Sequence, residues 1–163
     1  MVARFAVLAF AACVSFDACA DALQVLTVSQ AADRVRALEG KPVVMVLYST
    51  TCPISRRLMP QLGPLAAKSS RDIQWEVYST DDPRNFGDVQ AFLARNGAPF
   101  TPVAIEPWKA GDLIRAMGPL GIRIGSTWTR PLVAVRNSAG RIIAQEEAVD
   151  DIAGLRRAIA ALR

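Results

Sequence analysis

Cys52 is the residue of this chain best placed to do chemistry. It follows the apolar run 43–48 and opens a segment with helical periodicity, so the pattern predicts a strand, a tight turn and a helix. A thiol at a helix start lies beside unpaired N–H groups and the positive end of the helix dipole, which stabilise the thiolate. Pro53 suits the first helical position, where its missing N–H costs nothing. We expect a thiol that exchanges with disulfides.

Ser55 stands three positions after Cys52, where a C-x-x-C site would have its second sulfur. Its hydroxyl can hydrogen-bond to a thiolate but cannot attack a mixed disulfide; alternatively it is an ordinary first-turn helix residue. Cys52 has an alternative interpretation as a buried structural cysteine. Its polar neighbours favour a reactive thiol instead, because electropositive, partly exposed helix starts activate cysteines. Arg56 and Arg57 either form a solvated helix face or help to lower the pKa of Cys52.

This segment resembles the active-site segment of the thioredoxin superfamily. There a buried strand precedes a C-x-x-C at a helix start, and a proline follows the first cysteine by eight residues, as Pro60 follows Cys52. Residues 128–131, followed by two strands joined by the turn 137–140, resemble the cis-proline loop and terminal hairpin of that family. Cys52 and Pro131 are 79 residues apart, which is similar to the insertion-bearing TlpA/ResA-like branch.

The resemblance implies an α/β, thioredoxin-like fold with a central mixed sheet flanked by helices and an insertion before the cis-proline hairpin. It also implies that Pro131 is a cis-proline abutting the thiol, although only about 5–6% of X-Pro bonds in folded proteins are cis. Pro131, Arg130, Thr51 and Pro53 would then contact substrate. Trp128 is either a packing residue or part of the same surface.

The chain departs from the family pattern at two positions. Thr51 stands where the family commonly has a tryptophan, and Val46 stands where many members bury an acid that accepts the second thiol's proton. With no second thiol, such an acid has no task. The sequence has no histidine, which excludes Cys-His catalysis, Ser-His-Asp hydrolysis and histidine metal ligation. We therefore predict no metal site and no cofactor.

Two other functions remain open from the sequence. The chain could be a redox-silent binding or chaperone-like module that keeps the peptide groove of the fold. It could also be a one-cysteine thiol peroxidase, since those enzymes share the superfamily. Their P-x-x-x-[TS]-x-x-C signature fits Ser49 but requires proline where the chain has Met45.

Residues 1–22 resemble a secretory signal peptide. Arg4 precedes an apolar stretch of 12 residues, 5–16, and A-x-A sites follow at 18–20 and 20–22. That stretch is shorter than the roughly 20 residues of a membrane span. Lipid attachment at Cys13 or Cys19 is an alternative, although the residues before each match a lipobox poorly. We predict a periplasmic protein with no stable membrane insertion after cleavage.

Cleavage after residue 22 leaves one domain, 23–163, of 141 residues. It removes one basic and two acidic residues from a chain of net charge +4, so the exported protein carries +5. No lysine-rich run or aromatic–basic interleaving indicates nucleic acid. Cleavage also removes Cys13 and Cys19, which leaves a single thiol in an oxidising compartment. The expected partners are a substrate protein or small thiol at Cys52, and a membrane-bound electron donor.

The remaining elements follow from hydrophobic periodicity and from turn residues. Expected helices span 29–39, 53–67, 85–96, 109–117 and 150–162, and expected strands span 43–48, 73–79, 101–105, 129–135 and 141–148.

Overall fold

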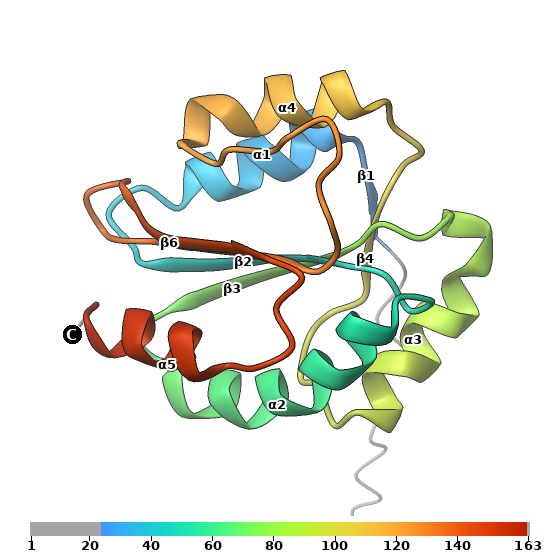
Figure 1. Cartoon of the computed structure of the whole chain (residues 1–163), viewed down its shortest axis with the longest axis horizontal. Coiled ribbons are helices and arrows are strands. Elements are labelled where there is room, and N and C mark those ends of the chain that lie inside the picture. The colour runs from blue at the N-terminus through green and yellow to red at the C-terminus, as the bar shows by residue number, and fades with distance from the viewer. Residues whose placement is uncertain (1–23, 163) are drawn as a thin grey trace, which may run out of the picture.

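A six-stranded mixed sheet forms the centre of the molecule (Figure 1). The computed structural model describes residues 24–162, so the expected signal peptide lies outside it. The strand order is β1-β4-β3-β2-β5-β6; the first four strands are mutually parallel, while β5 and β6 are antiparallel to their neighbours. The strands are β1 (Gln24–Leu26), β2 (Val43–Tyr48), β3 (Gln74–Ser79), β4 (Val103–Ile105), β5 (Leu132–Arg136) and β6 (Ile142–Glu147).

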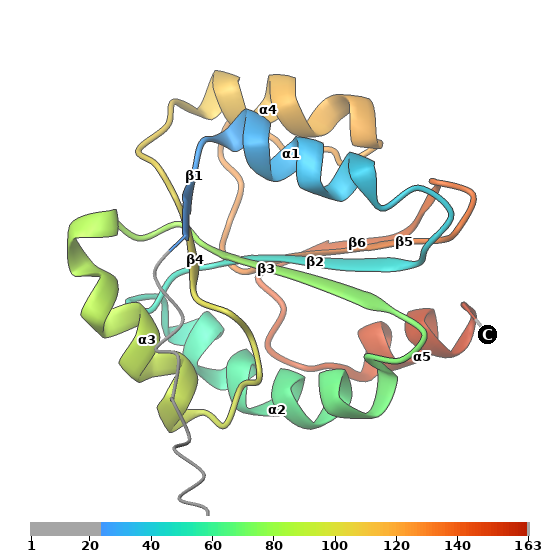
Figure 2. The ribbon, with the colours of Figure 1, turned by 180° about the vertical axis from the view of Figure 1, so that it is seen from behind.

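Helices cover both faces of this sheet. The helices α1 (Val28–Ala37) and α4 (Ala110–Met117) lie on one face, and α2 (Pro53–Ser69), α3 (Phe86–Arg95) and α5 (Ala153–Ala160) lie on the other (Figures 1 and 2). Two short 3-10 helices, η1 (Pro83–Asn85) and η2 (Gly118–Leu120), complete the described elements. This confirms the expected helix-flanked mixed sheet. Between residues 24 and 162, no helix is both long and apolar enough to cross a membrane.

Strand β2 is apolar throughout because both of its faces are covered. It pairs with β3 on one side and β5 on the other, and each of its residues is at most 1% exposed. Successive side chains of a strand point to opposite faces, so the strand supplies both cores. The core beneath α1 and α4 receives Val43, Met45 and Leu47; the core beneath α2, α3 and α5 receives Val44, Val46 and Tyr48.

One strand was missed, and several elements begin or end at other residues than expected; β5, for example, begins at Leu132 rather than at residue 129. β1 was not predicted, because a strand of only three residues carries too little periodicity to recognise. Helix α1 begins at Val28 rather than at residue 29, because Thr27 forms a capping box with Gln30. Helix α5 begins at Ala153, three residues later than expected.

Helix α2 carries Cys52 at its start and continues through two prolines, Pro60 and Pro64. Between them, Gly63 lies against the loop that follows α3. A Cβ added there would lie 2.8 Å from the carbonyl oxygen of Gly97, a contact closer than packed atoms allow. The glycine therefore allows α2 to pack closely against this loop.

Replacing Gly63 by alanine is expected to lower the free energy of unfolding by about 1–2 kcal/mol. Overpacking of this kind costs about 1–3 kcal/mol, and the better helix propensity of alanine offsets up to about 1 kcal/mol of that loss. Urea unfolding measures the change. Gly87→Ala in α3 is the matched control, because a Cβ there meets nothing within 4 Å. A stable Gly63→Ala variant would show that the loop moves freely.

Candidate active site

Cys52 is the N-cap residue of α2, and Pro53 is the first helical residue after it. One backbone hydrogen bond closes the turn before the helix, and a second begins the helix itself. The N–H of Cys52 donates to the carbonyl of Ser49 at 3.2 Å, and the N–H of Arg56 donates to the carbonyl of Cys52 at 3.1 Å. The thiol is partly exposed and forms no disulfide. A nucleophile in this position is both accessible and close to helix N–H groups.

The surroundings of Cys52 favour the thiolate. Partial burial has the largest single effect and raises the pKa of the thiol. Hydrogen bonds from the N–H and hydroxyl of Ser55 and from the N–H of Ile54, together with the charge of Arg130, outweigh it. The pKa of Cys52 therefore lies below the ordinary value of a cysteine. The charge that contributes is that of Arg130. Of the two alternatives for Arg56 and Arg57, the one in which they lower this pKa is not supported.

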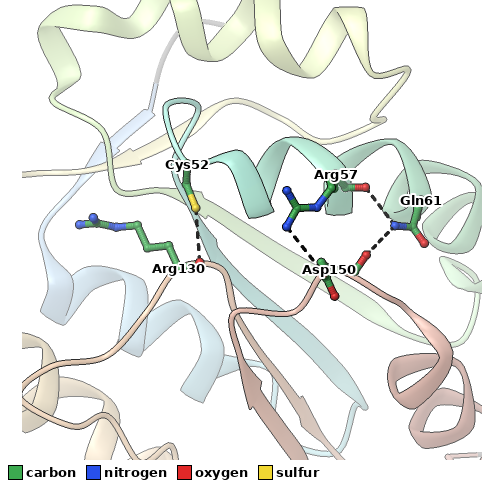
Figure 3. A network of polar contacts seen from close by, with 5 residues as sticks. All are labelled: Cys52, Arg57, Gln61, Arg130 and Asp150. Carbon is green, nitrogen blue, oxygen red and sulfur yellow. Dashed lines mark hydrogen bonds and ion pairs between the residues drawn. The ribbon is translucent and has the colours of Figure 1, made fainter.

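The loop before β5 faces the thiol. The Sγ of Cys52 donates to the carbonyl oxygen of Arg130 at 3.4 Å, and the Arg130–Pro131 peptide bond is cis, as predicted (Figure 3). The fold therefore brings the helix start and this loop together, although they are 78 residues apart at the contact. A molecule that reaches the sulfur also meets the backbone of this loop.

Ser55 is fully buried. Its hydroxyl accepts a hydrogen bond from the N–H of Ser49 at 3.4 Å and donates toward the Cys52 sulfur. The side chain thus turns into the loop that precedes the helix, where it supports both the turn and the thiolate. Substrate in solution cannot reach it.

Thr51 and Pro53 are both exposed beside Cys52. Thr51 contributes to a hollow of about 510 Å³ between the turn and α3. Arg56 is fixed at this hollow because its Nε donates to the carbonyl of Thr50 at 2.8 Å. The predicted contact residues therefore flank the thiol, although their role toward substrate stays a prediction.

Arg57 belongs to a separate network on the outside of α2. It pairs with Asp150 at 3.4 Å, and Gln61 donates to the carbonyl of Asp150 at 3.0 Å (Figure 3). These contacts connect α2 to the segment before α5. The next residue, Asp151, accepts from the N–H of Ala153 at the start of α5 at 3.0 Å.

Asp81 is a structural part of the site that sequence reasoning missed. Its carboxylate accepts from the hydroxyl of Ser49 at 2.5 Å, from the N–H of Thr50 at 2.8 Å and from the hydroxyl of Ser79 at 3.0 Å. The sequence predicts strands that end at residues 48 and 79, but only the structure shows that they pair in parallel with Tyr48 opposite Ser79, so that the residues after each strand meet at one edge. Asp81 therefore holds the turn that leads into Cys52.

Two tryptophans support the side chain of Arg130. The Cζ of its guanidinium lies 5.2 Å from the ring centroid of Trp128 and 6.0 Å from that of Trp108. The two rings lie 5.8 Å apart. We call Trp108, Trp128 and Arg130 the arginine–tryptophan cluster. Sequence reasoning proposed packing or substrate contact for Trp128 and did not predict that it lies beside Trp108.

The sheet order, the helix-start cysteine and the cis-proline loop together define a thioredoxin-like fold. Comparison with protein-family models gives no match, and comparison with curated protein sequences gives none either.

Solved structures share the fold. A candidate thiol:disulfide interchange protein DsbE from Chlorobium tepidum has a TM-score of 0.58 at 23% identity, covering 78% of this chain and 84% of that one. A secreted disulfide oxidoreductase of Mycobacterium tuberculosis, homologous to E. coli DsbE, has a TM-score of 0.59 at 21% identity, with coverages of 78% and 86%. The thioredoxin domain of a Bacteroides vulgatus thiol-disulfide oxidoreductase has a TM-score of 0.56 at 18% identity, with coverages of 76% and 81%.

Proposed function

We propose that this chain is an exported thiol–disulfide exchange protein that works through the single thiol of Cys52. The observation that carries the proposal is the pairing of an activated thiol at the start of α2 with a buried serine at the resolving position. The solved structures that share the fold include thiol–disulfide oxidoreductases, which supports the same chemistry.

The reaction follows from the site. The Cys52 thiolate attacks one sulfur of a substrate disulfide, the substrate S–S bond breaks, and the second substrate sulfur leaves as a thiolate. The product is a mixed disulfide at Cys52. Ser55 carries no sulfur and cannot displace it, so a thiol from outside the chain attacks next and restores the Cys52 thiolate. That second thiol comes from a small molecule or from a membrane-bound electron donor in the periplasm.

The pH dependence of Cys52 alkylation tests this proposal. Only the thiolate reacts, so the rate falls as pH falls through the pKa; we expect that fall below the ordinary cysteine value of about 8.5. The measurement uses iodoacetamide and the full chain with Cys13→Ser and Cys19→Ser, which leaves Cys52 as its one thiol. Ser55→Ala, which removes one hydrogen bond to the sulfur, should move the midpoint upward.

The pH dependence of alkylation, together with a test for mixed disulfides, also distinguishes thiol–disulfide exchange from the redox-silent binding module. A midpoint at 8.5 or above, with no mixed disulfide after incubation with oxidised glutathione, would favour the redox-silent binding module. A lowered midpoint with a mixed disulfide that persists on a non-reducing gel supports exchange through Cys52.

A further inference from the structure

Arg130 differs from the arginines that form ion pairs in residues 24–162. Those five each lie within 4 Å of a carboxylate, whereas Arg130 has no such partner in the described part of the chain. Its Nε is buried and has no hydrogen-bond acceptor. A partly buried guanidinium with unused donors is costly unless a ligand supplies the acceptor. The paired arginines are Arg34, Arg36, Arg57, Arg84 and Arg115.

Two acidic side chains near the cluster are already engaged, and a third, Glu106, lines the hollow beside Trp108 and does not pair with Arg130. Glu147 accepts from the N–H of Thr129 at 2.8 Å, and Asp112 pairs with Arg115 at 2.9 Å. Neither lies within ion-pair distance of Arg130. The position of Arg130 is also restricted, because its Cζ lies over the Trp128 and Trp108 rings and Glu147 holds the residue before it. Stacking on a ring leaves the edge donors of a guanidinium available for a carboxylate.

The cluster adjoins the reacting sulfur. The carbonyl of Arg130 lies 3.4 Å from the Sγ of Cys52, and its side chain extends to the side of the thiol opposite Arg57 and Asp150 (Figure 3). A group bonded to Cys52 therefore lies next to the residue that carries this guanidinium. The charge of the Arg130 guanidinium acts on the sulfur, because it helps to lower the pKa of Cys52, and it will therefore also act on a charged group bonded to that sulfur.

We propose that the arginine–tryptophan cluster selects disulfides that carry a carboxylate a few bonds from the sulfur that Cys52 attacks. The inference rests on the proposed function and names its substrate class. The carboxylate binds the edge of the Arg130 guanidinium, and the tryptophan rings accommodate the carbon chain beside it. The covalent step is unchanged: Cys52 bonds to the carboxylate-bearing half, and the other half leaves as a thiolate.

Three small disulfides of similar size test the selection. Dithiodiglycolate is a dianion, 2-hydroxyethyl disulfide is neutral and cystamine is a dication. The rate constant for the reaction of Cys52 with each disulfide is measured on the full chain with Cys13→Ser and Cys19→Ser. Each is divided by the rate constant of free cysteine with the same disulfide. We expect the dianion to be favoured over the dication by about tenfold or more at low salt, and 0.5 M salt to remove most of this preference.

Substitutions assign the preference to Arg130. Arg130→Gln should lower the dianion-to-dication ratio by about tenfold, and Arg130→Lys should keep part of it because the charge remains. Arg57→Gln is the matched control, because Arg57 is exposed and paired with Asp150; its ratio should not change. A pKa effect of Arg130 on Cys52 alters all three rates together and leaves the ratio unchanged. If Arg130→Gln does not fold, the lysine variant and the salt titration still show whether the charge preference depends on Arg130.

Two further probes distinguish the sources of such a carboxylate. One is oxidised glutathione, and the other is a disulfide-linked peptide with glutamate next to cysteine. Arg130-dependent reaction with either supports the selection, while Arg130-independent reaction with both overturns it. Reaction of Cys52 with every disulfide but without charge preference would overturn the selection alone. No reaction above that of free cysteine with any disulfide would overturn the proposed function as well.

Discussion

Replacing Ser55 by cysteine is expected to give the chain an internal disulfide and to shorten the life of its mixed disulfides by about a hundredfold or more. The new sulfur would stand three residues after Cys52 at a helix start, where the Ser55 side chain already reaches toward Sγ. An intramolecular thiol attacks at a high effective concentration, whereas an external thiol at millimolar concentration must diffuse in. The glutathione adduct of Cys52 should therefore resolve internally.

Free-thiol titration and non-reducing gels measure this change in the full chain with Cys13→Ser and Cys19→Ser. Ser69→Cys is the matched control, since Ser69 is also a buried serine of α2. It lies 17 residues after Cys52, which at about 1.5 Å per residue is too far for a disulfide. A Ser55→Cys variant that keeps two free thiols under oxidation would show that the helix start cannot support exchange.

Removing the Asp81 carboxylate is expected to lower the free energy of unfolding by about 2–4 kcal/mol. Three donors lose a charged acceptor, and each hydrogen bond to a charged group contributes about 1.5–3 kcal/mol, less than additively. Asp81→Ala should show the full loss in urea unfolding. Asp81→Asn should show a smaller loss, because its amide keeps one acceptor oxygen.

The control for Asp81 is Asp72→Ala, an exposed acid on the loop before β3, which should change stability by less than about 0.5 kcal/mol. Because Asp81 holds the turn before α2, Cys52 in Asp81→Ala should also react more slowly with iodoacetamide under native conditions. Equal stability of the alanine variant and the original chain would mean that the turn is held by the backbone alone.

The sequence predicts those parts of the fold that local pattern determines. The apolar run of β2 is recognisable because a strand covered on both faces has no polar positions. The start of α2 is recognisable because Cys52 and Pro53 follow that run directly. β1 is too short to show a period, and the strand with which it pairs, β4, comes about eighty residues later along the chain.

The residues of the site also differ in how well the sequence predicts them, according to how far apart they are along the chain. Cys52 and Ser55 are close in sequence, so their relation follows from helix geometry. Pro131 was placed beside the thiol by family resemblance alone. Asp81 acts on residues about thirty positions away, and Trp108 meets Trp128 only through the path of the chain between β4 and β5. Such contacts depend on strand order and loop course, which hydrophobic periodicity does not report.

The loop that carries Trp128 and Arg130 is fastened to β6 by side chains that bind its main chain. Gln145 binds the N–H and carbonyl of Arg123, and Glu147 binds the N–H of Thr129. Since these bonds use only peptide groups of the loop, its own side chains can be exchanged without releasing it. The reacting sulfur and the N–H groups that stabilise it belong to α2, whereas the partner choice that we propose would belong to a separately anchored loop. New specificities can therefore be acquired by substitution there while the thiol keeps its chemistry.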